Sequence, residues 1–203
     1  AIAIRAEAMR LFLMFMPRCV GFDPAYFLTF ADDRQKYSYA ASFAVPTLPD
    51  EFIDEYKKRL NGFQKFSVRE PSGEKLVKEL TGRTAETHLD PTLLISADEW
   101  KKIAVSKIDK PYILIFTANP AVSLVDFALK LSKEKKLPVY CINDAPHPVS
   151  HGINYIVAPT VEEFVGCFKN AEYVVTNSFH GTAFSVIFNK NLFVEFKNKS
   201  GRN

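Results

Sequence analysis

Hydrophobic positions follow two spacings along the chain, and the alternation of the two predicts its elements. Short apolar runs are typical of strands, whereas apolar residues three and four positions apart are typical of amphipathic helices. The runs predict strands at residues 36–43, 63–68, 85–89, 112–117, 138–142, 153–157, 173–176 and 192–196. The helical spacing predicts helices at residues 1–16, 50–60, 72–80, 97–104, 121–135, 160–169 and 178–188.

The repeated strand–helix–strand order predicts an α/β fold with a mostly parallel sheet covered by helices on both sides. In such sheets ligands bind beyond the carboxyl ends of the strands. A polar, Lys-rich stretch at residues 106–111 is the best candidate for a domain linker. We therefore expect an N-terminal domain at 1–105 and a C-terminal domain at 106–203.

Composition narrows the class of partner. Apolar residues make up 47% of the 203 positions, which suffices for one large core or two smaller ones. The net charge of +3 comes from basic residues scattered among acidic ones, so we expect no nucleic-acid partner. Cys19, Cys141 and Cys167 are far apart and form no CxxC pair. We expect reduced thiols in a cytoplasmic protein and no metal ion.

The segment after the apolar run 173–176 is the strongest candidate for a site. Asn177 or Ser178 can cap the helix that begins there. Backbone N–H groups from Phe179 to Thr182 would then face outward at a helix N-terminus, where they and the helix dipole attract anions. The turn is therefore suited to holding a phosphate.

His180 and Gly181 strengthen this interpretation. An imidazole in the first turn can donate a hydrogen bond to a phosphate oxygen or transfer a proton near neutral pH. Gly181 has no side chain, which would let a ligand approach the backbone closely. The structural alternative is that the polar residues only cap the helix and Gly181 only allows close packing.

A second group of candidates follows the predicted strand 63–68. Arg69 offers a planar fork to a carboxylate or phosphate, and Glu70 either orients it or caps the next helix. Asp90 is expected to cap the segment after it, and His88 to serve packing. Metal binding by His147 and His151 is disfavoured because prolines around them prevent a helix, so substrate contact is the better hypothesis for that loop.

Several of these stretches together resemble the polysaccharide pyruvyl transferase family. The order and spacing of the motifs agree from about residue 21 to residue 196. The motif at the start of the last predicted helix is the most distinctive. The resemblance is carried by residues 22–28, 36–43, 67–70, 90–94 and 170–185.

The resemblance implies two Rossmann-like domains similar to the GT-B glycosyltransferases, with the active site between them. It implies an N-terminal part that precedes this chain, an acceptor side at 1–105, and a donor side at 106–203 that is truncated at its end. The implied donor is phosphoenolpyruvate, with no separate cofactor. The implied acceptor is a sugar of a surface exopolysaccharide, and the product is a pyruvate ketal. A lipid-linked acceptor would bring peripheral contact with the inner face of the membrane.

On this resemblance, His180 and Arg69 are the expected catalytic residues. The family usually has Asp where this chain has Asn177, and Asn keeps the capping ability but not the charge. The expected substrate-binding residues are Asn177, Ser178, Phe179, Gly181, Thr182 and Glu70.

Two other functions stay open. A GT-B glycosyltransferase that uses a nucleotide-sugar would share the fold and the anion-binding helix end. A non-catalytic glycan-binding relative is suggested by Asn177 alone. A dehydrogenase is disfavoured, since no GxGxxG follows a predicted strand and no P-loop pattern occurs.

Overall fold

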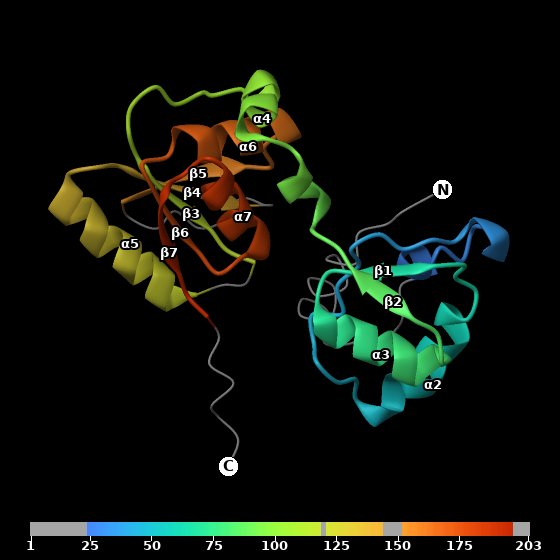
Figure 1. Ribbon diagram of the computed structural model, residues 1–203. Coiled ribbons are helices and arrows are strands. Elements are labelled where there is room, and N and C mark those ends of the chain that lie inside the picture. Colours follow the sequence, from blue (N-terminus) through green and yellow to red (C-terminus); the bar gives the residue numbers. More distant parts are fainter. Residues whose placement is uncertain (1–23, 119–120, 144–151, 197–203) are drawn as a thin grey trace, which may run out of the picture. The chain divides into compact units, whose positions relative to one another are not determined.

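The computed structural model describes residues 24–118, 121–143 and 152–196. The chain forms two compact units that divide between Pro91 and Thr92, and each is considered by itself (Figure 1). The predictions for the helix 1–16, for Cys19, and for the loop with His147 and His151 lie outside the described residues.

The first unit is a small parallel α/β unit. Its two strands pair in parallel, with Phe66 opposite Ala85 and Val68 opposite Thr87. The helix between them buries Leu76, Val77 and Leu80 against the sheet. The elements are the short 3-10 turns η1 (Pro24–Phe27) and η2 (Asp33–Gln35), then α2 (Asp50–Leu60), β1 (Phe66–Val68), α3 (Pro71–Thr81) and β2 (Ala85–Thr87).

Local sequence signals explain where the helices of this unit begin and end. Helix α2 has the bounds that the apolar spacing predicts. Helix α3 ends at Gly82, whose φ of 71° is the left-handed conformation that glycine adopts without strain. Glycine thus ends α3 one residue beyond the predicted end at residue 80.

The segment predicted as a strand at 36–43 pairs with β1 only through isolated parallel bridges, Tyr37 with Lys65 and Ala41 with Val68. Ala40 interrupts the extended backbone with a φ of 47°. Its N–H donates to the side-chain hydroxyl of Ser67 (3.1 Å) instead of to a backbone carbonyl of β1. A continuous strand there was therefore a wrong prediction, although the segment does lie beside β1.

The second unit holds a five-stranded sheet in the order β5-β4-β3-β6-β7, and every neighbouring pair is parallel. This confirms the predicted parallel α/β fold, which is Rossmann-like. The elements are η3 (Pro91–Leu94), α4 (Ala97–Ile103), β3 (Ile113–Phe116), α5 (Val122–Lys135), β4 (Val139–Asn143), β5 (Ile153–Val157), α6 (Val161–Asn170), β6 (Tyr173–Thr176), α7 (Phe179–Ile187) and β7 (Asn191–Val194).

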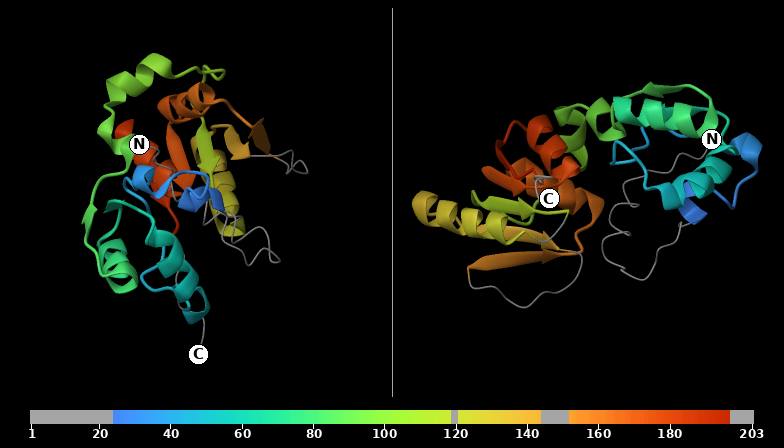
Figure 2. Two further views of the ribbon diagram at one scale, coloured as in Figure 1. Left: turned by 90° about the vertical axis from the view of Figure 1, so that its right-hand side faces the viewer. Right: turned by 90° about the horizontal axis from the view of Figure 1, so that it is seen from below.

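Helices cover both faces of this sheet. Leu124, Ala128 and Leu131 of α5 pack on one face, and Phe168 of α6 and Phe184 of α7 pack on the other. Figure 2 shows α5 (yellow) on one side of the sheet and the orange and red helices on the other. The central strands are consequently buried on both faces, as the continuous apolar run at 112–117 predicts.

Residues 92–105 pack with the second unit, so the predicted boundary at 105/106 falls inside it. The ring of Trp100 in α4 meets Phe184 of α7 edge to face, with centroids 5.1 Å apart. The N–H of Val105 donates to the carbonyl of Glu162 (2.9 Å). Aromatic packing therefore joins α4 to this unit, although a polar stretch follows it in the sequence.

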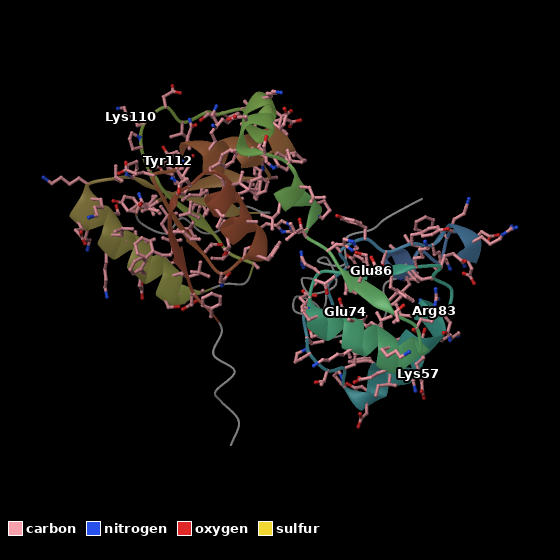
Figure 3. All side chains as sticks on the ribbon, in the orientation of Figure 1. Lys57, Glu74, Arg83, Glu86, Lys110 and Tyr112 are labelled. Atoms are coloured by element: carbon pink, nitrogen blue, oxygen red, sulfur yellow. The ribbon has the colours of Figure 1, made fainter. Side chains whose placement is uncertain are left out.

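The thiols of Cys141 and Cys167 are buried in the second unit. Burial raises the pKa of each thiol to about 11. Thiolate, which is the reactive form, is therefore scarce at neutral pH. Both residues are unoxidised in the structure and act as small apolar side chains. The Tyr112 hydroxyl nearby, labelled in Figure 3, donates to the Cys167 carbonyl (2.6 Å).

Candidate functional site

The turn between β6 and α7 is held by hydroxyl groups. The Thr176 hydroxyl donates to the Phe116 carbonyl on the neighbouring strand (2.5 Å) and accepts from the N–H of Ser178 (3.0 Å). Ser178 is the N-cap of α7, and its hydroxyl accepts from the N–H of Gly181 (3.5 Å). The predicted cap is thus Ser178, and the turn is fixed to the sheet beneath it.

Two of the four amides predicted to face an anion are used inside the helix. The N–H of Gly181 donates to the cap, and the N–H of Thr182 donates to the Ser178 carbonyl (3.0 Å). The Thr182 hydroxyl also donates to that carbonyl (3.1 Å). The prediction of outward amides at Gly181 and Thr182 was therefore wrong.

Gly181 is required for packing. A Cβ atom added there would clash with the Thr176 hydroxyl and lie 3.2 Å from the Phe116 ring. The bare side of Gly181 thus faces the sheet rather than a ligand. The structural alternative from the sequence explains this glycine better than the approach of a ligand does.

His180 lies in the first turn of α7, where the helix dipole places partial positive charge. Its ring meets the Phe179 ring edge to face (5.3 Å between centroids), and its Nε2 atom is shielded from solvent. Phe179 itself is 42% exposed. The helix has no acidic residue in its first turn, so no charge within the helix offsets the dipole there.

Asn177 joins the ends of two neighbouring strands. Its side-chain oxygen accepts a hydrogen bond from the N–H of Ala118, just after β3 (2.9 Å). An Asp at this position offers the same acceptor oxygen. The structural part of the role therefore needs no negative charge.

The turn lies at the point where the strand order reverses. From β3 the chain continues outward through β4 and β5, whereas β6 and β7 extend the sheet on the other side. The helices that follow β3 and β6 consequently cover opposite faces. Open parallel sheets bind ligands in the crevice at such a switch point. Asn177, Ser178, Phe179 and His180 are all at this edge.

A carboxylate that sequence reasoning missed lies at the same edge. Glu195 follows β7, and its Oε1 accepts from the hydroxyl of Ser123 (2.5 Å) in the first turn of α5. An acidic group is thus placed at the N-terminus of α5. Of the two helices that start at the switch point, α7 is consequently the better one for binding an anion. The predicted strand 192–196 included Glu195, so no signal in the sequence pointed to this role.

Arg69 belongs to the first unit and forms a buried ion pair. Its Nη1 lies 2.8 Å from Oδ2 of Asp90, whose side chain is fully buried. Arg69 follows β1 and Asp90 follows β2, so both lie at the carboxyl ends of neighbouring parallel strands. The carboxylate of Asp90 thus orients Arg69, and its expected role as a cap of the next segment stays a prediction.

Glu70 also orients Arg69 rather than capping α3. It is at the N-cap position, but its side chain makes no capping hydrogen bond. Its Oε1 accepts from the Ser42 hydroxyl and lies 3.8 Å from Nε of Arg69. The guanidinium therefore lies between two carboxylates, which fix its direction.

The structure brings the predicted residues together in two groups. Arg69 and Glu70 lie in the first unit, and the residues 177–182 lie in the second. Within the described ranges, no three His, Cys, Asp or Glu residues are placed to hold a metal ion. None of the described helices combines the length and apolar character that crossing a membrane requires.

The fold and the turn at its switch point define a Rossmann-like α/β protein with a helix end suited to an anionic ligand. A family model described as polysaccharide pyruvyl transferase matches residues 20–194. The chain belongs to this family, as the motifs in the sequence predict. None of the curated proteins compared with the chain matches it. Membership indicates a transferase of polysaccharide biosynthesis that acts on a polysaccharide acceptor.

Proposed function

We propose that the protein transfers a pyruvyl group from phosphoenolpyruvate to a sugar of a surface polysaccharide and forms a pyruvate ketal. The observation that carries the proposal is the β6–α7 turn, which sets His180 in the first turn of a helix with no acidic residue there, on the switch point. Family membership supplies the pyruvyl chemistry, and the turn supplies a place for a phosphate.

The proposed reaction has three steps. A proton adds to the methylene carbon of phosphoenolpyruvate, and the central carbon becomes electrophilic. One sugar hydroxyl adds to that carbon, the C–O bond to phosphate breaks, and inorganic phosphate leaves. A second hydroxyl then adds to the same carbon and closes the ketal. The two hydroxyls release two protons. One replaces the proton added to the methylene carbon, and the other goes to the departing phosphate.

The residues of the two groups have separate roles in this proposal. His180 supplies the proton or donates to the departing phosphate, which an imidazole can do near neutral pH. Asn177 and Ser178 hold the turn, and Phe179 begins the helix whose dipole attracts the phosphate. Arg69, oriented by Asp90 and Glu70, supplies a cation for the carboxylate or phosphate of the substrate. No metal ion is needed for these steps.

The two units are proposed to be the acceptor side and the donor side of a GT-B-like enzyme. The enzyme would work in the cytoplasm and meet the inner face of the membrane only through a lipid-linked acceptor. A GT-B glycosyltransferase is the second candidate, since an anion site at a helix end also suits a nucleotide diphosphate.

The test is acceptor-dependent release of inorganic phosphate from phosphoenolpyruvate. We expect His180→Ala to lower kcat/KM about 10²- to 10⁴-fold, the range for loss of a general acid. His180→Gln distinguishes the two roles, because Gln can donate to phosphate but cannot supply a proton to carbon. Unchanged turnover in His180→Ala would make the assignment wrong, and hydrolysis of a nucleotide-sugar instead would favour the second candidate.

A further inference from the structure

Two aromatic rings lie side by side on the first unit. Tyr39 and His88 are stacked, with ring centroids 5.8 Å apart and planes inclined by 29°. The side chain of His88 is 44% exposed, so it does not serve core packing as the sequence suggested. Tyr39 comes from the segment beside β1, and His88 directly follows β2. The two rings therefore meet across β1.

Ser67 on β1 fixes the histidine. Its hydroxyl oxygen lies 2.8 Å from Nδ1 of His88 and accepts from the N–H of Ala40 (3.1 Å). Glu86 on β2, labelled in Figure 3, lies near the other ring nitrogen, with its Oε2 3.7 Å from Nε2. His88 is thus held at Nδ1 by Ser67 and has a carboxylate beside Nε2.

The ring pair adjoins the buried ion pair of the same sheet. Ser67 and Arg69 are two residues apart, and so are His88 and Asp90, so alternation places all four on one face. Val68 between them points the other way, against Gly73 of α3. One strand repeat of about 7 Å therefore separates the Ser67–His88 contact from the Arg69–Asp90 pair.

We propose that Tyr39, His88 and Glu86 form a subsite that binds a pyranose ring of the acceptor. A pyranose has a face of C–H groups that packs on aromatic rings, and hydroxyls that need donors and acceptors. Nε2 of His88 and the Glu86 carboxylate, 82% exposed, are the polar groups for those hydroxyls. The class of this ligand rests on the proposed function. A nucleotide base could stack on the same rings, but Glu86 would repel its phosphates.

The test is saturation-transfer NMR on the full chain with the methyl glycosides of glucose, galactose and mannose, and with UMP. At least one glycoside is expected to receive saturation. Its apparent affinity should fall about tenfold in Tyr39→Ala and in His88→Gln, which keeps an acceptor for Ser67 but loses the ring. Tyr39→Phe retains the ring and should bind like the parent. Phe30→Ala removes a 64% exposed aromatic residue of the same unit and should have no effect.

Equal affinity for the glycosides in the parent, Tyr39→Ala and His88→Gln would overturn the subsite, as would saturation of UMP alone. A parallel thermal-shift titration with phosphoenolpyruvate separates this proposal from the proposed function. If phosphoenolpyruvate still raised Tm in His88→Gln, and the affinity for the glycosides were the same in the variants as in the parent, only the subsite would be refuted. Ring-dependent sugar binding without any response to phosphoenolpyruvate would refute only pyruvyl transfer.

Discussion

The two strand-to-helix turns that carry the candidate residues are built from different chemistry. The turn after β1 is held by charges, since Arg69 is paired with Asp90 and lies near Glu70. The turn after β6 is held by neutral groups, through the hydroxyls of Thr176 and Ser178. A buried charge is costly to leave alone, so the first turn depends on each partner. The second depends instead on close packing.

The difference matches what each turn can offer a substrate. The charged turn presents a cation whose direction is fixed by carboxylates. The neutral turn places His180 in a first turn of α7 that has no acidic residue, whereas Glu195 faces the N-terminus of α5. A cation held by two carboxylates and an imidazole held by neutral groups are thus kept in separate turns.

The largest effect is expected when the charged turn loses its counter-ion. Asp90→Ala leaves the Arg69 guanidinium, only 11% exposed, without its buried carboxylate. Breaking a buried pair on one side costs about 3–5 kcal/mol of unfolding free energy. Urea unfolding followed by circular dichroism, with hydrogen exchange in α3, measures the loss in the first unit.

Asp54→Ala is the matched control, because Asp54 is an exposed residue of α2 in the same unit. We expect it to change the free energy of unfolding by less than about 0.5 kcal/mol. If Asp90→Ala were no more harmful than Asp54→Ala, the ion pair would not hold this turn.

Alkaline pH should weaken the second unit before the first. Burial raises the pKa of Cys141 and Cys167 to about 11, and that of Tyr56 in the first unit to about 12. A raised folded-state pKa means that the folded protein holds its proton longer, so stability is lost as pH rises through the interval between the two values. From the ordinary values of 9 and 10, the loss due to the thiols runs over pH 9–11 in the second unit, and the loss due to Tyr56 runs over pH 10–12 in the first. Burial also raises the pKa of Tyr112 in the second unit, so its contribution is lost from about pH 10 upward.

Fluorescence of Trp100, the single tryptophan, reports unfolding of the second unit in urea. Between pH 9 and pH 11 we expect its unfolding free energy to fall by about 2 kcal/mol for each buried thiol. The double variant Cys141→Ala, Cys167→Ala should flatten this slope whatever its stability at pH 7. An unchanged slope in that variant would mean that other groups cause the loss.

The neutral turn should be sensitive to size at Gly181. Gly181→Ala forces a methyl group against the Thr176 hydroxyl and the Phe116 ring, and such overpacking costs about 1–3 kcal/mol. Trp100 fluorescence again reports unfolding, because the Trp100 ring contacts Phe184 of α7, the helix that contains Gly181. Val186→Ala, at a 65% exposed position of α7, is the control and should cost much less. Equal stability of the two variants would contradict the packing role.

The smallest effect concerns Asn177. Asn177→Asp keeps an oxygen for the N–H of Ala118, so the unfolding free energy should stay within about 0.5 kcal/mol of the parent. Asn177→Ala removes the acceptor and should cost about 1 kcal/mol. Urea unfolding followed by Trp100 fluorescence compares the two variants. A larger loss of unfolding free energy in Asn177→Asp than in Asn177→Ala would show that an uncharged side chain is required.

The sequence predicted the elements better than their contacts. Helix α2 and strand β6 have their predicted bounds, because apolar spacing and caps are local signals. The capping box of Thr160 and Glu163 marks the start of α6, where the predicted helix 160–169 begins. The candidate turn was found for the same reason, since its cap, His180 and Gly181 follow one another in the chain.

The contacts that define each turn could not be predicted, since they join distant segments. Asp90 lies 21 residues from Arg69, and Glu195 lies 72 residues from Ser123. Which strands become neighbours decides these pairs, and hydrophobic spacing does not specify the strand order. The sequence also could not predict that Gly181 faces the sheet, because this depends on how α7 packs on β6.

The two turns are proposed to bind phosphoenolpyruvate. A thermal-shift titration of the full chain with phosphoenolpyruvate, with UDP, CMP and GDP as controls, measures this binding. We predict a rise in Tm with phosphoenolpyruvate alone, which is lost in Arg69→Ala and in His180→Ala but kept in Phe30→Ala. A rise only with a nucleotide, or a rise with phosphoenolpyruvate that survives both substitutions, would contradict it.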